Sequence, residues 1–261
     1  RLDIAAQPAP LGMPGVQGLN LDFDVNQVGG KASVSMAEGR LELPAIFEDP
    51  SLLLDQLSAD VQWKLDADRV QVTVPNLRFA NADAQGDAQI KWQTADQPAG
   101  VVSPHGRFPG VLDLQGSLSR VQLARVARYL PLALESDVRN YVRDAVLGGA
   151  ASNVKFKLKG DLRTFPYADA KQGDFRVSAE VKEATFAYAP PLVLAKDSLP
   201  WPSLTQLSGD FVMEHDTLQL KGARGVLGSS AVQITKAEGA VDKLFSKATV
   251  AVTVEAKGPL G

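Results

Sequence analysis

The chain has 261 residues, with 27 Lys and Arg against 30 Asp and Glu for a net charge of −3, two His and no Cys. This balance, without any dense Lys/Arg stretch, excludes the concentrated positive field that nucleic-acid binding needs. The absence of Cys excludes disulfides, thiolate zinc sites, iron–sulfur clusters and thiol nucleophiles. With 45% hydrophobic and 22% charged residues, the composition is typical of an ordered globular chain.

The first part of the chain alternates apolar and polar residues with a period of two. Leu19 to Val25 is the first clear run, and Val61 to Leu65 and Val70 to Val74 follow it. Clusters such as Asn81-Ala82-Asp83 separate the runs and supply turn chemistry. This alternation predicts strands of an antiparallel sheet with one apolar and one wet face.

The region from Ser119 to Leu147 has a period of 3.6 instead, which predicts two amphipathic helices broken at Pro131. Ser119 and Ser136 are the expected N-caps, and Gly148-Gly149 is the expected C-terminal stop. We expect the helices to cover an apolar sheet face or to plug one end of the sheet.

Alternating runs return after the helices, which divides the chain into three parts. A six-residue element, Gln56 to Val61, recurs as Gln206 to Phe211, and this repetition indicates strands stacked along one axis. The last alternating run leads straight into a turn, so we expect the β structure to continue beyond residue 261. The predicted parts are a β-rich segment at 1–118, a helical pair at 119–149 and a second β-rich segment at 150–261.

No constellation of residues in the sequence predicts catalysis. His105 and His215 both lie in turn-like sequences without metal-ligand spacing, so we expect surface turn residues. No phosphate-binding loop and no nucleophile elbow is present. Lys155, Lys157 and Lys159 form a basic stripe that favours a solvated strand face over a site for anionic headgroups. We therefore expect a protein that is not an enzyme and has no catalytic residues, metal or cofactor.

The repeated apolar face is the remaining candidate for function. It must be hidden against something, either as the ordinary core of a closed sandwich or as an open groove for acyl chains, and periodicity does not separate the two. The candidate groove residues are Trp63, Val70, Val72, Val74, Phe156, Leu158, Phe175, Val177, Val181, Leu218, Leu220, Val250, Val252 and Val254.

A series of short motifs gives the chain a family resemblance that covers most of its length and is densest from about residue 120 to 245. The motifs include Tyr129-Leu130-Pro131, Gly160-Asp161-Leu162, Phe165-Pro166-Tyr167, Gly173-Asp174-Phe175, Trp201-Pro202 and Leu207-Ser208-Gly209. By the order and spacing of these motifs the chain resembles the AsmA-like superfamily, specifically its large YhdP branch.

The resemblance implies a mainly β fold, an elongated, curved antiparallel sheet of repeated strands that forms an open groove or half-barrel. It further implies a periplasmic piece of a large Gram-negative envelope protein, anchored in the inner membrane by a helix outside this fragment. Such a protein carries phospholipid towards the outer membrane and supports the envelope barrier. The implied partners are phospholipid acyl chains, the inner membrane and other envelope proteins, but no nucleic acid. The alternative is a non-catalytic scaffold or assembly factor for outer-membrane components, with a closed β-sandwich core.

Overall fold

A computed structural model describes residues 2–6, 14–66, 69–96, 106–194, 199–228, 230 and 232–259. Within them the chain forms one 13-stranded sheet in which the strands follow one another in sequence order. The strands are β1 (Leu2–Ile4), β2 (Gly15–Asn26), β3 (Gly29–Glu42), β4 (Ser51–Asp66), β5 (Arg69–Ala80), β6 (Ala84–Gln93), β7 (Val111–Gln122), β8 (Val146–Asp161), β9 (Gly173–Phe186), β10 (Leu204–Glu214), β11 (Thr217–Leu227), β12 (Gln233–Asp242) and β13 (Thr249–Lys257).

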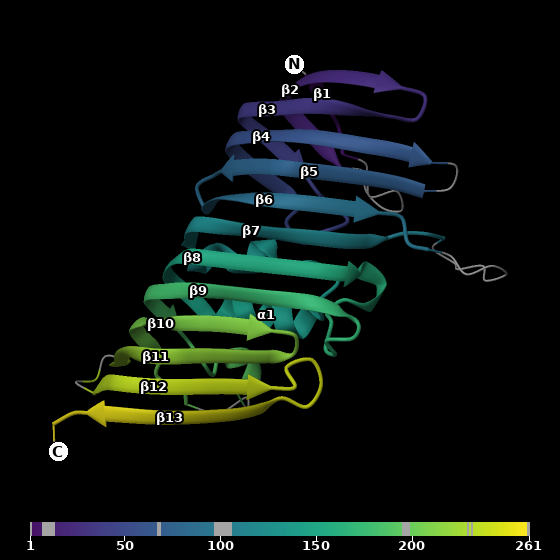
Figure 1. The fold of residues 1–261 in the computed structure, drawn as a ribbon. Helices are drawn as coiled ribbons and strands as arrows, with labels where there is room; N and C mark the ends of the chain where they lie inside the picture. The colour runs from purple at the N-terminus through teal and green to yellow at the C-terminus, as the bar shows by residue number, and fades with distance from the viewer. Residues whose placement is uncertain are drawn as a thin grey trace.

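Every pair of neighbouring strands is antiparallel, and β1 and β13 lie at opposite ends of the sheet (Figure 1). This confirms the expected elongated, mainly β architecture with one antiparallel sheet. The alternative of a closed sandwich is wrong for the described residues, because they form a single open sheet with no second sheet to pack against it.

A line of bulges across the sheet bends the strands away from a flat surface. Glu38, Asn153, Glu183 and Gln206 have φ between 51° and 54°, in the left-handed region, although none of them is glycine. The strand registers also shift near all four positions, in the β2–β3, β8–β9 and β9–β10 pairings. Because a bulge bends its strand and increases the local twist, one half of each long strand curls behind the other half (Figure 1).

The bend also changes which residues of a strand are buried. In β4 the buried side chains before the bend are Leu52 and Leu54, whereas after it Ala59 is buried. The alternation thus switches from even to odd positions within a single strand. A strict period of two does not predict this switch.

The described part of the chain has four short helices, all in connections between strands: η1 (Leu123–Tyr129), α1 (Ser136–Ala145), η2 (Leu162–Thr164) and η3 (Pro191–Val193). The predicted helix ends are wrong. Ser119 lies in β7, and the N-cap of α1 is Glu135, which makes no side-chain capping hydrogen bond. Strand pairing explains the shorter helices, because the ladder between β7 and β8 reaches Gln122 and Ala150 and satisfies their backbone groups.

The most compact apolar cluster lies where η1 meets the bent strands. Ala184, Leu207 and Ala223 form its buried centre, and Leu123 of η1 packs against them. The helices η1 and α1 therefore lie behind the strands in the view of Figure 1, on the inner side of the bend. None of the helices in the described ranges has both the length and the apolar character to cross a membrane.

Candidate functional site

The strand register places the candidate groove residues of the N-terminal part on one face. Residues directly opposite each other on antiparallel neighbours project from the same face of a sheet. Trp63 lies opposite Val72, which in turn lies opposite Trp92 of β6. Val70 and Val74 stand two residues to either side of Val72 and share its face.

The same face continues without interruption into the C-terminal part. A row of directly opposite residues on neighbouring strands runs from Val74 through Ile90, Leu114 and Leu158 to Phe175. A neighbouring row runs from Phe156 through Val177, Met213, Leu218 and Val241 to Val250. The remaining candidates lie in further rows on the same face: Val181 is opposite Gly209, Leu220 opposite Phe211, Val252 opposite Gly239 and Val254 opposite Ala237.

All fourteen candidates thus share one continuous apolar face that extends from β4 to β13. Sequence reasoning missed several members of it, among them Trp92, Leu114, Phe211 and Met213. The alternation around Leu114 and Phe211 carried the signal, but pairing across the sheet was needed to place these residues in the same rows.

The apolar face is uncovered towards both ends of the sheet. Val250 and Val252 on β13 are 66% and 61% exposed. Phe23 on β2, which extends the face beyond β4 because it lies opposite Ala32 and Ala32 lies opposite Val61, is 61% exposed. Exposed apolar side chains grouped on an ordered sheet are typical of surfaces that bind a ligand, a membrane or another protein, and also of surfaces prone to aggregation.

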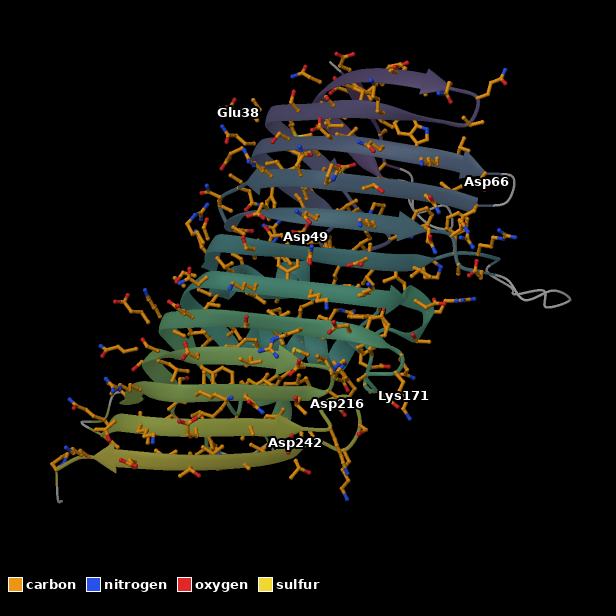
Figure 2. The ribbon with its side chains drawn as sticks, viewed as in Figure 1. Glu38, Asp49, Asp66, Lys171, Asp216 and Asp242 are labelled. Carbon is orange, nitrogen blue, oxygen red and sulfur yellow. The ribbon has the colours of Figure 1, made fainter. Side chains whose placement is uncertain are left out.

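Charged side chains occupy the opposite face and the strand ends. Lys157 forms an ion pair with Asp174, and Lys159 lies 3.2 Å from a carboxylate oxygen of Asp113. These pairings support the solvated strand face for the lysine stripe. At the strand ends, Asp66, Lys171, Asp216 and Asp242 lie along one edge of the sheet (Figure 2).

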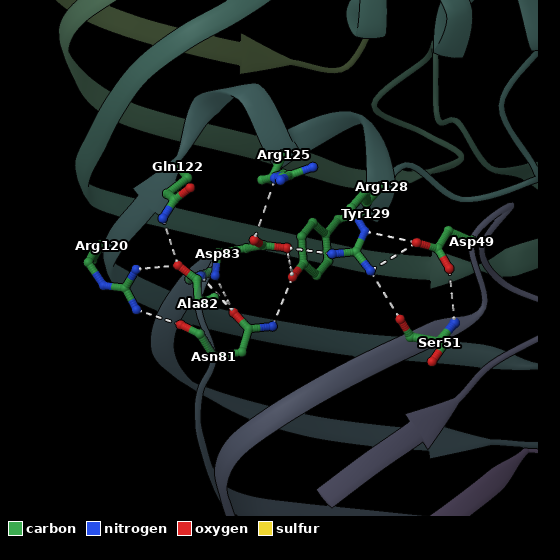
Figure 3. Close-up of polar contacts among 11 residues, drawn as sticks. Asp49, Ser51, Asn81, Ala82, Asp83, Arg120, Gln122, Arg125, Arg128 and Tyr129 are labelled. Atoms are coloured by element: carbon green, nitrogen blue, oxygen red, sulfur yellow. Dashed lines mark hydrogen bonds and ion pairs between the residues drawn. The ribbon is translucent and has the colours of Figure 1, made fainter. Parts of the chain in front are cut away.

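A buried polar network joins η1 to the sheet (Figure 3). Asp83, in the turn between β5 and β6, is only 7% exposed, and it accepts hydrogen bonds from Arg128 Nη1 at 2.9 Å and from the Tyr129 hydroxyl at 3.0 Å. Asn81 Nδ2 donates to the same hydroxyl at 2.9 Å. Burial raises the pKa of Tyr129, so its hydroxyl stays a donor throughout the physiological range.

Arg128 also contacts the connection between β3 and β4. Its Nε donates to a carboxylate oxygen of Asp49 at 3.0 Å, and its Nη2 donates to the carbonyl of Ser51 at 3.1 Å. Burial works against its charge, but Asp49 and Asp83 outweigh that effect and raise the pKa of Arg128. The sequence predicts a turn at Asn81-Ala82-Asp83, and the hydrogen bond from Asp83 N to Asn81 Oδ1 at 3.0 Å confirms it. The polar network around Asp83 was not predicted from the sequence.

The one described histidine, His215, has no partner arrangement that indicates catalysis. His215 lies at the tip of the β10–β11 hairpin, as expected, and its Nδ1 is 3.2 Å from the carbonyl oxygen of Tyr167. His105 lies outside the described residues. Across the described ranges, no three His, Asp or Glu side chains are grouped so that they could hold a metal ion.

Tyr167 is a fully buried residue in the connection between β8 and β9. Its ring packs so closely on Gly160 that a Cβ there would lie 2.8 Å from Tyr167 Cζ. Its hydroxyl has no hydrogen-bond partner among the described residues, and burial raises its pKa to about 12.

Comparison with known proteins gives two matches in sequence. The family described as YhdP protein matches residues 3–261. The intermembrane phospholipid transporter YhdP of Escherichia coli (strain K12) is 24% identical over 251 residues, which cover 95% of this chain and 18% of that protein. The chain therefore spans about a fifth of the length of this relative. No solved structure matches the chain.

Proposed function

The chain belongs to the YhdP protein family, and from this premise we propose that it is a segment of a conduit along which phospholipid moves with its acyl chains against the apolar face. The observation that carries the proposal is the unbroken row from Phe156 to Val250, which crosses six strands and ends in exposed valine side chains. The relative's activity, phospholipid transport between membranes, supports the same function.

The energetics of lipid transfer require such a face. A diacyl lipid in water exposes about thirty methylenes, and at ~0.8 kcal/mol each their exposure costs on the order of 25 kcal/mol. A conduit has to offset this cost evenly along its length, because a deep local well would trap the lipid. Rows of Val, Leu and Phe with charges on the other face and at the strand ends meet this requirement, and they need no catalytic residue and no cofactor.

The location and direction of transport are part of the proposal. We infer that the segment lies in the periplasm, that an anchor elsewhere in the protein holds it to the inner membrane, and that lipid travels towards the outer membrane. The relative's role between two membranes supports this arrangement. Contacts with other envelope proteins at the far membrane belong to the same inference.

Site-specific photo-crosslinking tests the proposal. A photoreactive residue is placed at Val72, Val177 or Val252 in the intact protein in its cells, and captured lipid is identified by mass spectrometry. Adjacent positions on the opposite face serve as matched controls: Gln71, Arg176 and Thr253. We expect several-fold more lipid at the three valines than at the controls. Equal capture on the two faces would refute the conduit.

A further inference from the structure

The apolar face is crossed at its middle by one segment, residues 123–145, which we call the strap. It comprises η1, α1 and the turn between them. Leu123 packs on the buried cluster, and two candidate groove residues, Val181 and Leu220, pack on the same cluster. The strap therefore lies on the apolar face itself and occupies space that acyl chains would need.

On one side the strap is fastened to the connection between β3 and β4. Phe47 and Pro131 form an isolated antiparallel bridge, and Leu132 N donates to the carbonyl of Ile46 at 2.8 Å. Arg128 adds the bonds to Asp49, Ser51 and Asp83 described above. We call these Arg128 contacts the latch.

On its other side the strap meets the connection between β9 and β10. The Tyr141 hydroxyl donates to the carbonyl of Tyr188 at 3.0 Å. The ring of Tyr188 in turn packs edge-on against Trp201, with centroids 5.7 Å apart. The strap thus reaches from the β3–β4 connection to the β9–β10 connection, across the strands that lie between them.

The side chains of the strap are themselves little buried. In η1 no residue is buried, and in α1 Ala145 alone is buried, although α1 is amphipathic. The apolar side chains Val138, Tyr141 and Val142 are only partly buried. Segments with few buried apolar contacts open at a lower free-energy cost than the sheet that carries them.

We propose that the strap is a releasable barrier over the middle of the apolar face, and that the latch centred on Arg128 keeps it seated between passages of lipid. This inference rests on the proposed conduit function. When the latch opens, Leu123 leaves the cluster and acyl chains gain access to the face around Val181. The partly buried apolar side of α1 then lines the passage as its second wall.

An engineered disulfide tests whether the strap has to move. The chain has no cysteine, so Phe47→Cys with Pro131→Cys creates a single pair at bridge positions, whose Cα spacing suits a disulfide. Lipid capture is measured in the intact protein in cells by photoreactive residues at Val72, Val181 and Val252, under oxidising and reducing conditions. The two single-cysteine variants are the controls, and non-reducing electrophoresis verifies the bond.

We expect the oxidised disulfide to reduce lipid capture at Val181 and at one of the two outer sites, Val72 or Val252. Reduction of the disulfide should restore lipid capture. Capture that is the same in the oxidised and reduced states at all three sites would overturn the barrier while leaving the conduit intact. A lack of capture at all three sites even under reduction would instead count against the conduit, and the strap proposal would fall with it.

Release of the latch provides the complementary test. Arg128→Met removes the contacts with Asp49 and Asp83. Its matched control is Arg143→Met, because among the described residues the hydrogen bonds of Arg143 stay within α1, to Asn140 and Asp144, and Glu48 attracts its charge without a hydrogen bond. We expect hydrogen exchange in residues 123–145 to be roughly ten-fold faster in Arg128→Met than in the control. Capture at Val181 should rise in the same variant. Equal exchange in the two variants would show that Arg128 does not hold the strap.

Discussion

The middle and the C-terminal end of the sheet carry the same alternating sequence pattern but differ in what covers it. Under the strap, Leu207 is 5% exposed and Ala223 is fully buried. On β13, Val252 is 61% exposed although it stands on the same face. The segment that covers the strand, and not the periodicity of the strand, therefore decides whether an apolar residue serves as core or as surface.

The largest difference in stability is expected between two variants in which one apolar side chain is truncated, one variant in each region. Leu207→Ala should lower the free energy of unfolding by about 3 kcal/mol, because it leaves a cavity in the cluster beneath Leu123. Val252→Ala should cost less than ~1 kcal/mol, because its side chain is already largely in water. Urea unfolding of the two variants measures the difference. Equal losses would mean that the middle of the sheet is no better packed than its end.

The latch should show the next largest effect. Arg128→Met removes the closer of two arginines from the buried carboxylate of Asp83, which among the described residues keeps only Arg125 at 4.0 Å as a cationic partner, and should cost about 2 kcal/mol. In an Asp83→Asn background the same change should cost about 1 kcal/mol less, because the neutral amide leaves no unpaired buried charge when Arg128 is removed. A double-mutant cycle by chemical denaturation measures this coupling. Additive losses would show that the two residues act independently.

Tyr167 gives a smaller, pH-dependent effect. Its pKa is raised to about 12 by burial, whereas the phenol of the unfolded chain ionises near 10. The folded state therefore keeps a proton that the unfolded state loses, so stability is complete below about pH 10 and falls as the pH rises towards 12. Tyr167→Phe should remove this part of the alkaline loss. At neutral pH it should leave stability unchanged or raise it by up to ~1 kcal/mol, since the buried hydroxyl has no partner among the described residues.

Alkaline unfolding curves of the wild type and Tyr167→Phe test this prediction. Tyr188→Phe is a suitable control, because it removes a tyrosine hydroxyl near the strap instead of the one buried against Gly160. If all three proteins lose stability in parallel above pH 10, Tyr167 is not the group responsible.

The smallest effect is expected on the charged face. Lys159→Gln breaks an exposed ion pair with Asp113, and such pairs contribute little in water. The denaturation midpoint and lipid capture at Val177 should both stay as in the wild type. A fall in lipid capture would mean that the lysine stripe binds lipid headgroups. The charged face would then take part in lipid binding together with the apolar face.

Much of the sheet follows from local sequence, because alternation such as Val70 to Val74 or Val250 to Val254 defines each strand and its apolar side. The bend does not follow in the same way. It depends on left-handed conformations at Glu38, Asn153 and Gln206, residue types that do not favour this conformation as glycine does. Only the pairing of neighbouring strands fixes where these bulges fall.

The strap shows the same limit at longer range. Its helical period was visible in the sequence, but its ends were not, because pairing between β7 and β8 takes residues from both flanks. The latch joins Arg128 to Asp83, which is 45 residues away, and to Asp49, which is 79 residues away. Three polar residues at these separations carry no local signal, whereas each of the fourteen candidate groove residues lies in an alternating run.

The linear strand order has a consequence for how the segment responds to force and heat. Each described strand pairs with its neighbours in sequence, so stability accumulates step by step along the sheet as in a repeat protein. The strap departs from this scheme, because it ties the β3–β4 connection to the β9–β10 connection. The strands between them should therefore unfold as one cooperative unit, while β12 and β13 peel away separately from their end. A sheet built in this way should bend and fray at its outer strands, whereas the middle, where the strap is seated, should keep its shape.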